Sequence, residues 1–167
     1  MKARVFVRQP VLADGRAFLA AVATSHGLHH PWIKAPQTRV EFKAWLARTA
    51  QPGYLAFLVC ERDSGRLVGV INISNIVGGL FRCAYLGYYA FAGHERQGYM
   101  REGLQGVIRH AFKTLKLHRL EANIQPGNVA SLALVAACGF SKEGYSPRYL
   151  KIGGRWRDHE RWAMLAS

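Results

Sequence analysis

The sequence is short of acidic residues, of cysteine and of long apolar stretches. Aspartate and glutamate together number 10 against 23 lysines and arginines, so the formal net charge is +13 and the isoelectric point lies near 10.2. A chain with so few carboxylates attracts anionic partners, such as the phosphates of a nucleotide, an RNA surface or an acidic protein. The charge alone does not choose among these, and it also suits a plain role in solubility.

The cysteines are far apart and odd in number, which argues against a disulfide framework, and none has the close Cys or His neighbour of a zinc site. They are Cys60, Cys83 and Cys138. A small histidine group has no carboxylate or cysteine beside it, so we expect no bound metal. It comprises His26, His29 and His30.

No apolar run approaches the ~18 residues that a membrane-spanning helix needs. The N-terminal segment turns polar again before the core of a signal peptide could form. We therefore expect no membrane span and predict a cytoplasmic protein. The 167 residues contain no repeat, linker or low-complexity tract, and this length suits a single domain over residues 1–167.

An amphipathic helix begins near Met100, and the turn before it is the candidate functional centre. Its apolar residues share one helical face; they are Met100, Leu104, Val107, Ile108, Ala111, Phe112 and Leu115. Gly98 lacks a Cβ, so the chain can turn tightly and a ligand can approach the free N–H groups of the first helical turn. Arg96 and Arg101 flank this turn although the helix dipole disfavours cations there, and a bound phosphate would resolve that conflict. The alternative is an ordinary helix start with solvated arginines.

Alternating apolar residues and turn signals predict a mixed α/β fold. The predicted strands are Ala3–Arg8, Tyr54–Cys60, Leu67–Ile76, Leu80–Phe91, Arg119–Ile124, and a C-terminal β-hairpin of Tyr149–Ile152 and Arg155–Asp158 around Gly153 and Gly154. About four helices should flank the sheet, near residues 15–25, 39–50, 100–115 and 128–138. In the second helix, Val40, Trp45 and Leu46 should face inward, whereas residues 29–36 should form an irregular loop. A strand, a long helix and another strand form a crossover, so the strand at Arg119 should lie parallel to the one ending near Phe91 in a mostly antiparallel sheet that is splayed at this pair.

This order of elements resembles the GNAT superfamily of acetyl-CoA-dependent N-acetyltransferases. The likeness extends over most of the chain. The run from Gln97 to Glu102 and the ending from Gly154 to His159 look most like the ribosomal-protein-alanine N-acetyltransferases of the RimJ/RimL type. The resemblance implies acetyl-CoA as the acetyl donor, with no metal.

The resemblance also implies which residues bind acetyl-CoA. The turn should hold the pyrophosphate through the backbone of Gln97, Gly98, Tyr99, Met100 and Arg101, with Arg96 beside it. Tyr89, Ala90 and Phe91 should line the acetyl arm, and Asn123, Asn128 and Ser131 should hold the cofactor from the next strand and helix cap. Glu95 and Met100 depart from the family pattern, which places affinity more in question than the binding mode, because the contacts are mostly main-chain.

Two side chains are implied as catalytic. Ser131 matches the serine with which RimJ/RimL-type enzymes reprotonate the thiolate, since the position of the usual tyrosine is Val135 here; alternatively, its hydroxyl bonds its own helix backbone. Glu121, on the polar face of its strand, is the first candidate for the general base, although an ion pair with Arg119 is the structural alternative. Tyr149, Asp158 and His159 are further candidates, and solvent alone is another. The position where some relatives carry a glutamate is Arg148 here.

The resemblance says less about which residues bind the acceptor amine and which amine it is. Trp32, Tyr88 and Tyr149 would bind the acceptor, although Trp32 would serve equally well to seal its loop onto the core. The first hypothesis is acetylation of a protein N-terminus, quite plausibly that of a ribosomal protein. The alternatives are acetylation of a small amine, such as a polyamine, amino acid or antibiotic, and a non-catalytic basic module that binds ribosome or RNA.

A basic ridge runs along the predicted central helix and supports the first hypothesis. Arg101, Gln105, Arg109 and Lys113 succeed one another at four-residue spacing, away from the apolar stripe. Together with Arg155 and Arg157 they could steer the protein weakly to RNA or an acidic partner and would repel a cationic amine. A solvated helix face is the simpler explanation. The sequence is compatible with a monomer or a homodimer.

Overall fold

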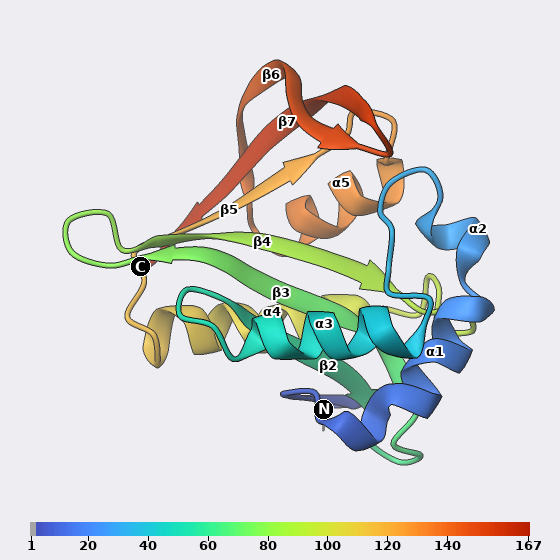
Figure 1. Cartoon of the computed structure of the whole chain (residues 1–167). Coiled ribbons are helices and arrows are strands. Elements are labelled where there is room, and N and C mark those ends of the chain that lie inside the picture. The colour runs from blue at the N-terminus through green and yellow to red at the C-terminus, as the bar shows by residue number, and fades with distance from the viewer. Residues whose placement is uncertain (1–2) are drawn as a thin grey trace.

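The computed structural model of the chain describes residues 3–167. Within these residues seven strands form one sheet in the order β1-β2-β3-β4-β5-β7-β6 (Figure 1). The strands are β1 Val5–Arg8, β2 Leu55–Glu61, β3 Leu67–Val77, β4 Cys83–Ala90, β5 Arg119–Ile124, β6 Ser141–Ile152 and β7 Arg155–Leu165. Every neighbouring pair is antiparallel except β4 and β5. The predicted mixed α/β fold with one parallel pair and a C-terminal hairpin is confirmed.

The helices lie on both faces of this sheet. They are α1 Gly15–Ala23, α2 His26–His29, α3 Arg39–Thr49, α4 Tyr99–Lys113 and α5 Val129–Ala137, with a short 3₁₀ turn at Leu12–Asp14. Helices α1 and α3 pack on one face, and α4 and α5 pack on the other (Figure 1). The predicted number of about four helices left out α2, a single turn that ends at His29, the first residue of the segment 29–36 that was expected to be irregular. No helix in residues 3–167 combines the length and apolar character that a membrane crossing requires.

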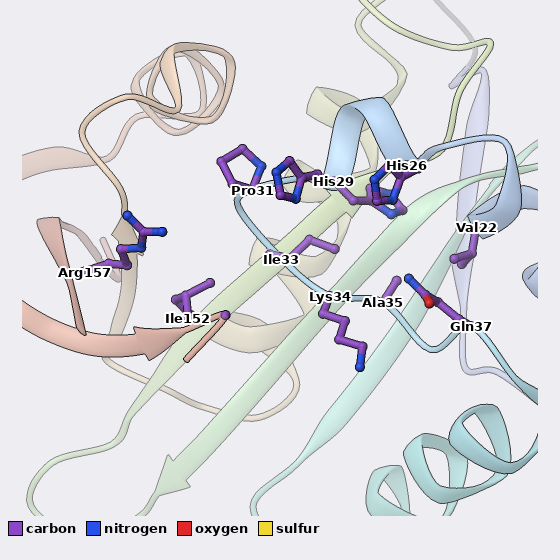
Figure 2. A pocket seen from close by; sticks show the side chains of 12 residues that line it. Val22, His26, His29, Pro31, Ile33, Lys34, Ala35, Gln37, Ile152 and Arg157 are labelled. Atoms are coloured by element: carbon purple, nitrogen blue, oxygen red, sulfur yellow. The ribbon is translucent and has the colours of Figure 1, made fainter. Parts of the chain in front are cut away.

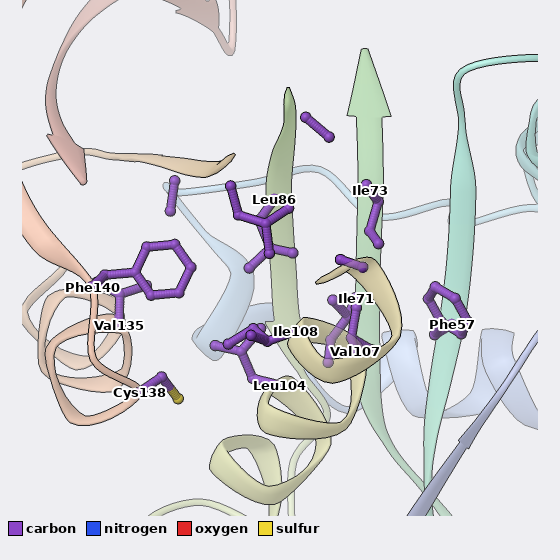
Figure 3. Close-up of a cluster of buried hydrophobic side chains, with 14 of the residues drawn as sticks. Phe57, Ile71, Ile73, Leu86, Leu104, Val107, Ile108, Val135, Cys138 and Phe140 are labelled. Atoms are coloured by element: carbon purple, nitrogen blue, oxygen red, sulfur yellow. The ribbon is translucent and has the colours of Figure 1, made fainter. Parts of the chain in front are cut away.

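Two apolar clusters hold the layers together. Leu104, Val107 and Ile108 of α4 pack against Ile71 and Leu86 of the sheet, as the stripe on α4 predicts. Figure 3 shows this cluster with Val135 of α5 and with Cys138 and Phe140, which lie between α5 and β6, completing it. Complete burial of such a side chain contributes about 1.5–3 kcal/mol, so this cluster anchors the helix whose N-terminus forms the candidate site.

On the other face, α1 and α3 bury a cluster of aromatic rings. Phe18 and Trp45 stack with their ring centroids 5.1 Å apart. Thr38 and Glu41 form the predicted capping box at the start of α3. The prediction for Val40 was wrong, since this side chain is 77% exposed and Phe42 is buried instead. Phe42 and Trp45, three residues apart, mark the inner face of α3, and Val40, two residues before Phe42, lies on the outer face.

The pair β4–β5 opens along its length. Three residue pairs are in register, ending at Tyr85 and Glu121. Residues 86–90 of β4 and 122–124 of β5 lie beyond the last pair, and we call them the splayed ends. Because strands that separate leave backbone N–H and C=O groups without a sheet partner, this is where the fold offers its backbone to a ligand.

Candidate active site

The turn before α4 presents a row of unused backbone donors. Arg96 and Gly98 both have positive φ, 58° and 80°, so successive amides point to one side of the chain. Within residues 3–167 no hydrogen bond uses the backbone N–H groups of residues 96–101. These donors lie at the positive end of a helix, where an anion is stabilised.

Contacts from distant parts of the chain hold this turn. The Arg4 guanidinium donates to the backbone oxygen of Gln97 at 2.8 Å and to Glu102 at 2.6 Å. It also lies 4.5 Å from the ring centroid of Tyr99. Glu95 accepts from the Gly93 N–H at 2.7 Å. The turn is therefore braced by an N-terminal residue that no local pattern in the sequence reveals.

The two departures from the family pattern have structural roles in this turn. Glu95 closes the turn from its own side through Gly93, and the side chain of Met100 packs into the cluster beneath α4. Neither side chain takes up a backbone donor of residues 96–101. The departures thus leave the array of N–H groups intact.

Along β4, alternate residues direct their backbone N–H and C=O groups to β3 and to the opposite side, toward β5. The Phe91 N–H donates to the Val68 oxygen at 2.7 Å, and the register then makes Tyr89 and Gly87 the residues that bond β3. The polar backbone groups of Tyr88 and Ala90 consequently face the splayed ends. The Ala90 oxygen accepts a hydrogen bond of 2.8 Å from His29 Nε2. Of the three residues expected along the acetyl arm, Ala90 turns its backbone to the gap, whereas the Phe91 ring is buried in the aromatic cluster.

Ser131 lies opposite the splayed end of β4. Its N–H donates to Asn128 Oδ1 at 3.2 Å, which makes Asn128 the N-cap of α5 as predicted. Its hydroxyl lies 2.7 Å from the Tyr88 hydroxyl, which also reaches the Ser131 carbonyl oxygen at 3.1 Å. Burial raises the pKa of Tyr88 well above its ordinary value. Tyr88, expected at the acceptor, therefore holds Ser131 from the α5 side of the sheet.

The opposite face of the sheet collects polar residues. Leu120, Ala122 and Ile124 of β5 are buried toward α4 and α5, so Glu121 and Asn123 face the other way. The Glu121 Oε1 atom accepts from Arg119 Nε at 2.7 Å, which is the ion pair foreseen as the structural alternative. Its Oε2 atom has no hydrogen bond within the described residues. The Asn123 Oδ1 atom is buried without a hydrogen-bond partner in the described part of the chain.

Open space lies over the middle of β4 on this polar face. Gly87 is exposed although β4 is an internal strand, and a Cβ built on it would meet no atom within 4 Å. Asn72 pairs with Gly87 across β3 and β4, and its Oδ1 atom is buried without a partner among the described residues. Two unpaired amide oxygens, on Asn72 and Asn123, thus face the side from which a ligand with N–H groups would come.

Two of the predicted acceptor residues border this space. Tyr149 lies beside Tyr85, and its hydroxyl raises the pKa of Tyr85. The Trp32 carbonyl accepts from Gln125 at 3.3 Å, and its ring lies where a Cβ on Gly127 would come within 3.1 Å of it. Trp32 therefore joins the segment after α2 to the loop after β5.

A pocket of about 320 Å³ adjoins this face (Figure 2). It lies between the segment from Val22 to Gln37 and the turn of the β6–β7 hairpin, with His29, Ile152 and Arg157 among its lining residues. His29 is 5% exposed, and burial lowers its pKa. In residues 3–167 no group of three or more His, Cys, Asp or Glu side chains is arranged to hold a metal ion.

The sequence missed several of these residues. Arg4 and His29 contact the site from positions far away in the sequence. Asn72 and Gly87 lie in two strands whose sequences are typical of a buried sheet. The structure brings together Ser131, Asn128 and Tyr88 on one side of the splayed ends, and Glu121, Asn123 and Tyr149 on the other side.

Comparisons with known proteins agree with this architecture. The family described as "Acetyltransferase (GNAT) domain" matches residues 4–141. The chain therefore belongs to the acetyltransferase (GNAT) family, as the resemblance in the sequence predicted. A sequence relative and a solved structure also confirm the likeness to the RimJ/RimL type.

The Escherichia coli protein named [Ribosomal protein uS5]-alanine N-acetyltransferase is 43% identical over 103 residues, which are 62% of this chain and 53% of that protein. The solved structure of Mycobacterium smegmatis RimJ in complex with CoA-disulfide superposes with a TM-score of 0.87 at 29% identity, over 97% of this chain and 82% of that one. Spermidine N(1)-acetyltransferase of Vibrio cholerae is 26% identical over 65% of this chain and 62% of its own length. The chain spans a little over half the length of the curated relatives it matches.

Proposed function

We propose that the chain transfers an acetyl group from acetyl-CoA to the N-terminal α-amine of a protein, specifically a ribosomal protein, by direct attack in a ternary complex. The observation that carries the proposal is the turn of residues 96–101, whose free N–H groups and positive φ angles suit a pyrophosphate, next to splayed strand ends. The names of the relatives support the acceptor class.

The residues present fit acetyl-CoA. The turn offers backbone N–H donors to phosphate. The backbone of Tyr88 and Ala90 offers donors and acceptors to the amide groups of the pantetheine arm. The buried side-chain oxygen of Asn123 can accept a further hydrogen bond from the ligand. Arg96 and Arg101 add positive charge beside the turn. We assign the predicted cofactor role to these groups.

Acetyl-CoA, when bound, supplies an activated thioester, and the amine displaces its sulfur, so that a C–N bond forms as the C–S bond breaks. The amine loses one proton and the sulfur gains one. Ser131 Oγ donates that proton to the sulfur and regains one from water, and the Tyr88 hydroxyl at 2.7 Å orients the serine. The Oε2 atom of Glu121 takes the proton of the amine, directly or through water.

The α-amine suits this site because its unperturbed pKa, near 8, leaves an appreciable neutral fraction at physiological pH. A lysine side chain, with a pKa near 10.4, would need a stronger base. A polyamine is the second candidate acceptor, favoured by the spermidine relative, but its charges would face a surface with a net charge of +13.

The test is a direct assay of transfer. Purified protein would be incubated with acetyl-CoA and pooled peptides beginning with Ala or Ser, or with spermidine, while release of free thiol is followed and mass spectrometry locates the acetyl group. We expect acetylation of the α-amine, and none on a peptide with a blocked N-terminus and an internal lysine. Faster turnover of spermidine than of any peptide would refute the proposed acceptor.

A further inference from the structure

The pocket between the segment from Val22 to Gln37 and the β6–β7 hairpin has basic but no acidic side chains in its lining. Its titratable lining consists of His26, His29, His30, Lys34 and Arg157, with no acidic residue among the lining side chains. The remaining lining is mainly apolar, including Ile33 and Ile152. A site of this kind favours a ligand that carries negative charge on a short apolar stem.

The nearest acidic side chains are already committed. Glu41 lies 4.0 Å from Lys34 Nζ, but its Oε2 atom accepts from the N–H groups of Gln37 at 2.7 Å and Thr38 at 3.2 Å. Asp158, next to Arg157 in sequence, accepts from the Tyr145 hydroxyl at 2.6 Å and the Arg148 N–H at 2.8 Å. Lys34 is therefore partly neutralised by Glu41, whereas neither carboxylate bonds the Arg157 guanidinium.

The Arg157 side chain gives the strongest indication that the pocket binds an anionic group. Its guanidinium group forms no ion pair and donates no hydrogen bond within residues 3–167. Its Nε atom is buried without a hydrogen-bond partner. A buried guanidinium nitrogen without an acceptor costs free energy, and such groups in folded proteins call for an explanation. Figure 2 shows the Arg157 side chain extending from β7 at the pocket wall. Its two terminal nitrogens also have no acceptor among the described residues, and they could bind a carboxylate in the pocket, whose two oxygens match the guanidinium fork.

The pocket is continuous with the proposed reaction site. His29 lines the pocket, and its Nε2 atom donates to the Ala90 oxygen at the splayed end of β4. Arg157 belongs to the same strand face as Arg161, which pairs with Asn123 on β5. A peptide whose α-amine lies over the splayed ends would thus place its following side chains toward this pocket.

We infer that this pocket binds an acidic side chain close behind the acetylated residue of the acceptor, with Arg157 bonding the carboxylate and Lys34 adding charge. This inference rests on the proposed function, and it narrows the acceptor to a protein N-terminus with a glutamate or aspartate at its second or third residue. Arg157 and Lys34 are specificity-determining residues in this proposal, and they take no part in the chemistry.

The experiment compares three hexapeptides that share a first serine and a common C-terminal half. Their second and third residues are two glutamates, two glutamines or two lysines. With the native protein we expect kcat/KM for the glutamate peptide to exceed that for the glutamine peptide about tenfold, as befits one charge-assisted hydrogen-bonded pair. The lysine peptide should be the poorest acceptor.

Variants assign the preference to its residues. Arg157→Gln should lower kcat/KM for the glutamate peptide about tenfold and so bring the glutamate-to-glutamine ratio close to one, and Arg157→Lys should retain part of the preference. Lys34→Glu should raise kcat/KM for the lysine peptide about two- to threefold, because Lys34 is exposed and its charge is screened. Lys151→Gln and Lys43→Gln, exposed lysines outside the pocket, should leave every ratio unchanged.

The outcomes separate this inference from the proposed function. Equal kcat/KM for the glutamate and glutamine peptides in the native protein, or a ratio untouched by Arg157→Gln, would overturn the acidic pocket while peptide acetylation stands. Acetylation of spermidine with none of the three peptides would overturn the proposed function itself. Thermal melting of each variant identifies one that has failed to fold, and Lys34→Glu, at an exposed position, then decides the matter.

Discussion

Gly98 is the position at which a single substitution tests the phosphate-binding turn most directly. Its φ of 80° lies in the left-handed region, which costs an L-residue roughly 1–2 kcal/mol and glycine almost nothing. A Cβ at this position would also lie 3.2 Å from Arg4 Nη2, the group that holds the Gln97 oxygen. A side chain therefore strains the turn from within and pushes away the Arg4 side chain that holds it.

Three variants distinguish backbone conformation from bulk. Asn populates the left-handed region more readily than other side chains do, so Gly98→Asn should keep the turn and raise the Kd for acetyl-CoA only about two- to threefold. Gly98→Ala should raise the Kd about tenfold, equivalent to ~1.4 kcal/mol. Gly98→Val, which is β-branched, should exceed that and bring binding near the limit of detection.

Isothermal titration calorimetry with acetyl-CoA measures these changes, and circular dichroism checks that each variant is folded. Gly79→Val is a matched control, because Gly79 also has a positive φ, 62°, but lies in the turn between β3 and β4, where a Cβ would meet no atom within 4 Å. It should lower the melting temperature slightly and leave the Kd unchanged. If folded Gly98→Val binds acetyl-CoA as tightly as the native protein, the turn does not hold the phosphates and the argument fails.

Four further predictions address the chemistry, the acceptor and the fold. Ser131→Ala should lower kcat about 10²-fold with little effect on the affinity for acetyl-CoA; a change confined to KM would mean that the hydroxyl only positions the cofactor. Glu121→Gln should lower kcat about 10²-fold and move the pH profile; a loss below threefold would assign deprotonation to solvent. Asp14→Asn should cost about 2 kcal/mol in urea unfolding. Arg8 lowers the pKa of Asp14 in the folded protein. The stability that the Asp14 carboxylate contributes is therefore complete above the pKa of Asp14 in the unfolded chain, near 4, and is lost as the pH falls through its lower pKa in the folded protein. The native protein and Asp14→Asn should thus become equally stable in acid. Finally, kcat/KM for a ribosomal protein should fall steeply with salt while that for a neutral peptide stays nearly constant; equal slopes would exclude electrostatic steering by the ridge on α4.

The parts of the fold that follow from local patterns were predictable. The stripe from Met100 along α4 has helical periodicity and packs inward as expected. Asn128 caps α5 because a short polar side chain before an apolar run satisfies the first N–H groups. The parallel pair followed from a strand, a long helix and a strand in succession. Each of these conclusions needs only neighbouring residues and a general rule of packing.

Contacts between distant segments were not predictable from such patterns. Arg4 braces a turn more than ninety positions away, and its neighbours in sequence give no sign of this role. Tyr88 was expected at the acceptor, yet the alternation of β4 turns it toward α5 and Ser131. A strand pattern defines two faces, but it does not say which side chain of another element each face will meet.

The two faces of the sheet explain why the chemistry can be assigned more firmly than the acceptor. On the α5 side, Ser131 is fixed twice, by the Asn128 cap and by the Tyr88 hydroxyl, so its position depends on rigid elements. On the other side, the boundary is made by the segment after α2, which meets the loop after β5 at Trp32 and the β6–β7 hairpin at the pocket of Arg157. Loops of this kind tolerate changes of length and sequence without disturbing the sheet. Substitution in the turn before α4 should therefore change the affinity for acetyl-CoA and substitution of Ser131 should change kcat, whereas substitution of Lys34 or Arg157 should change the choice of acceptor.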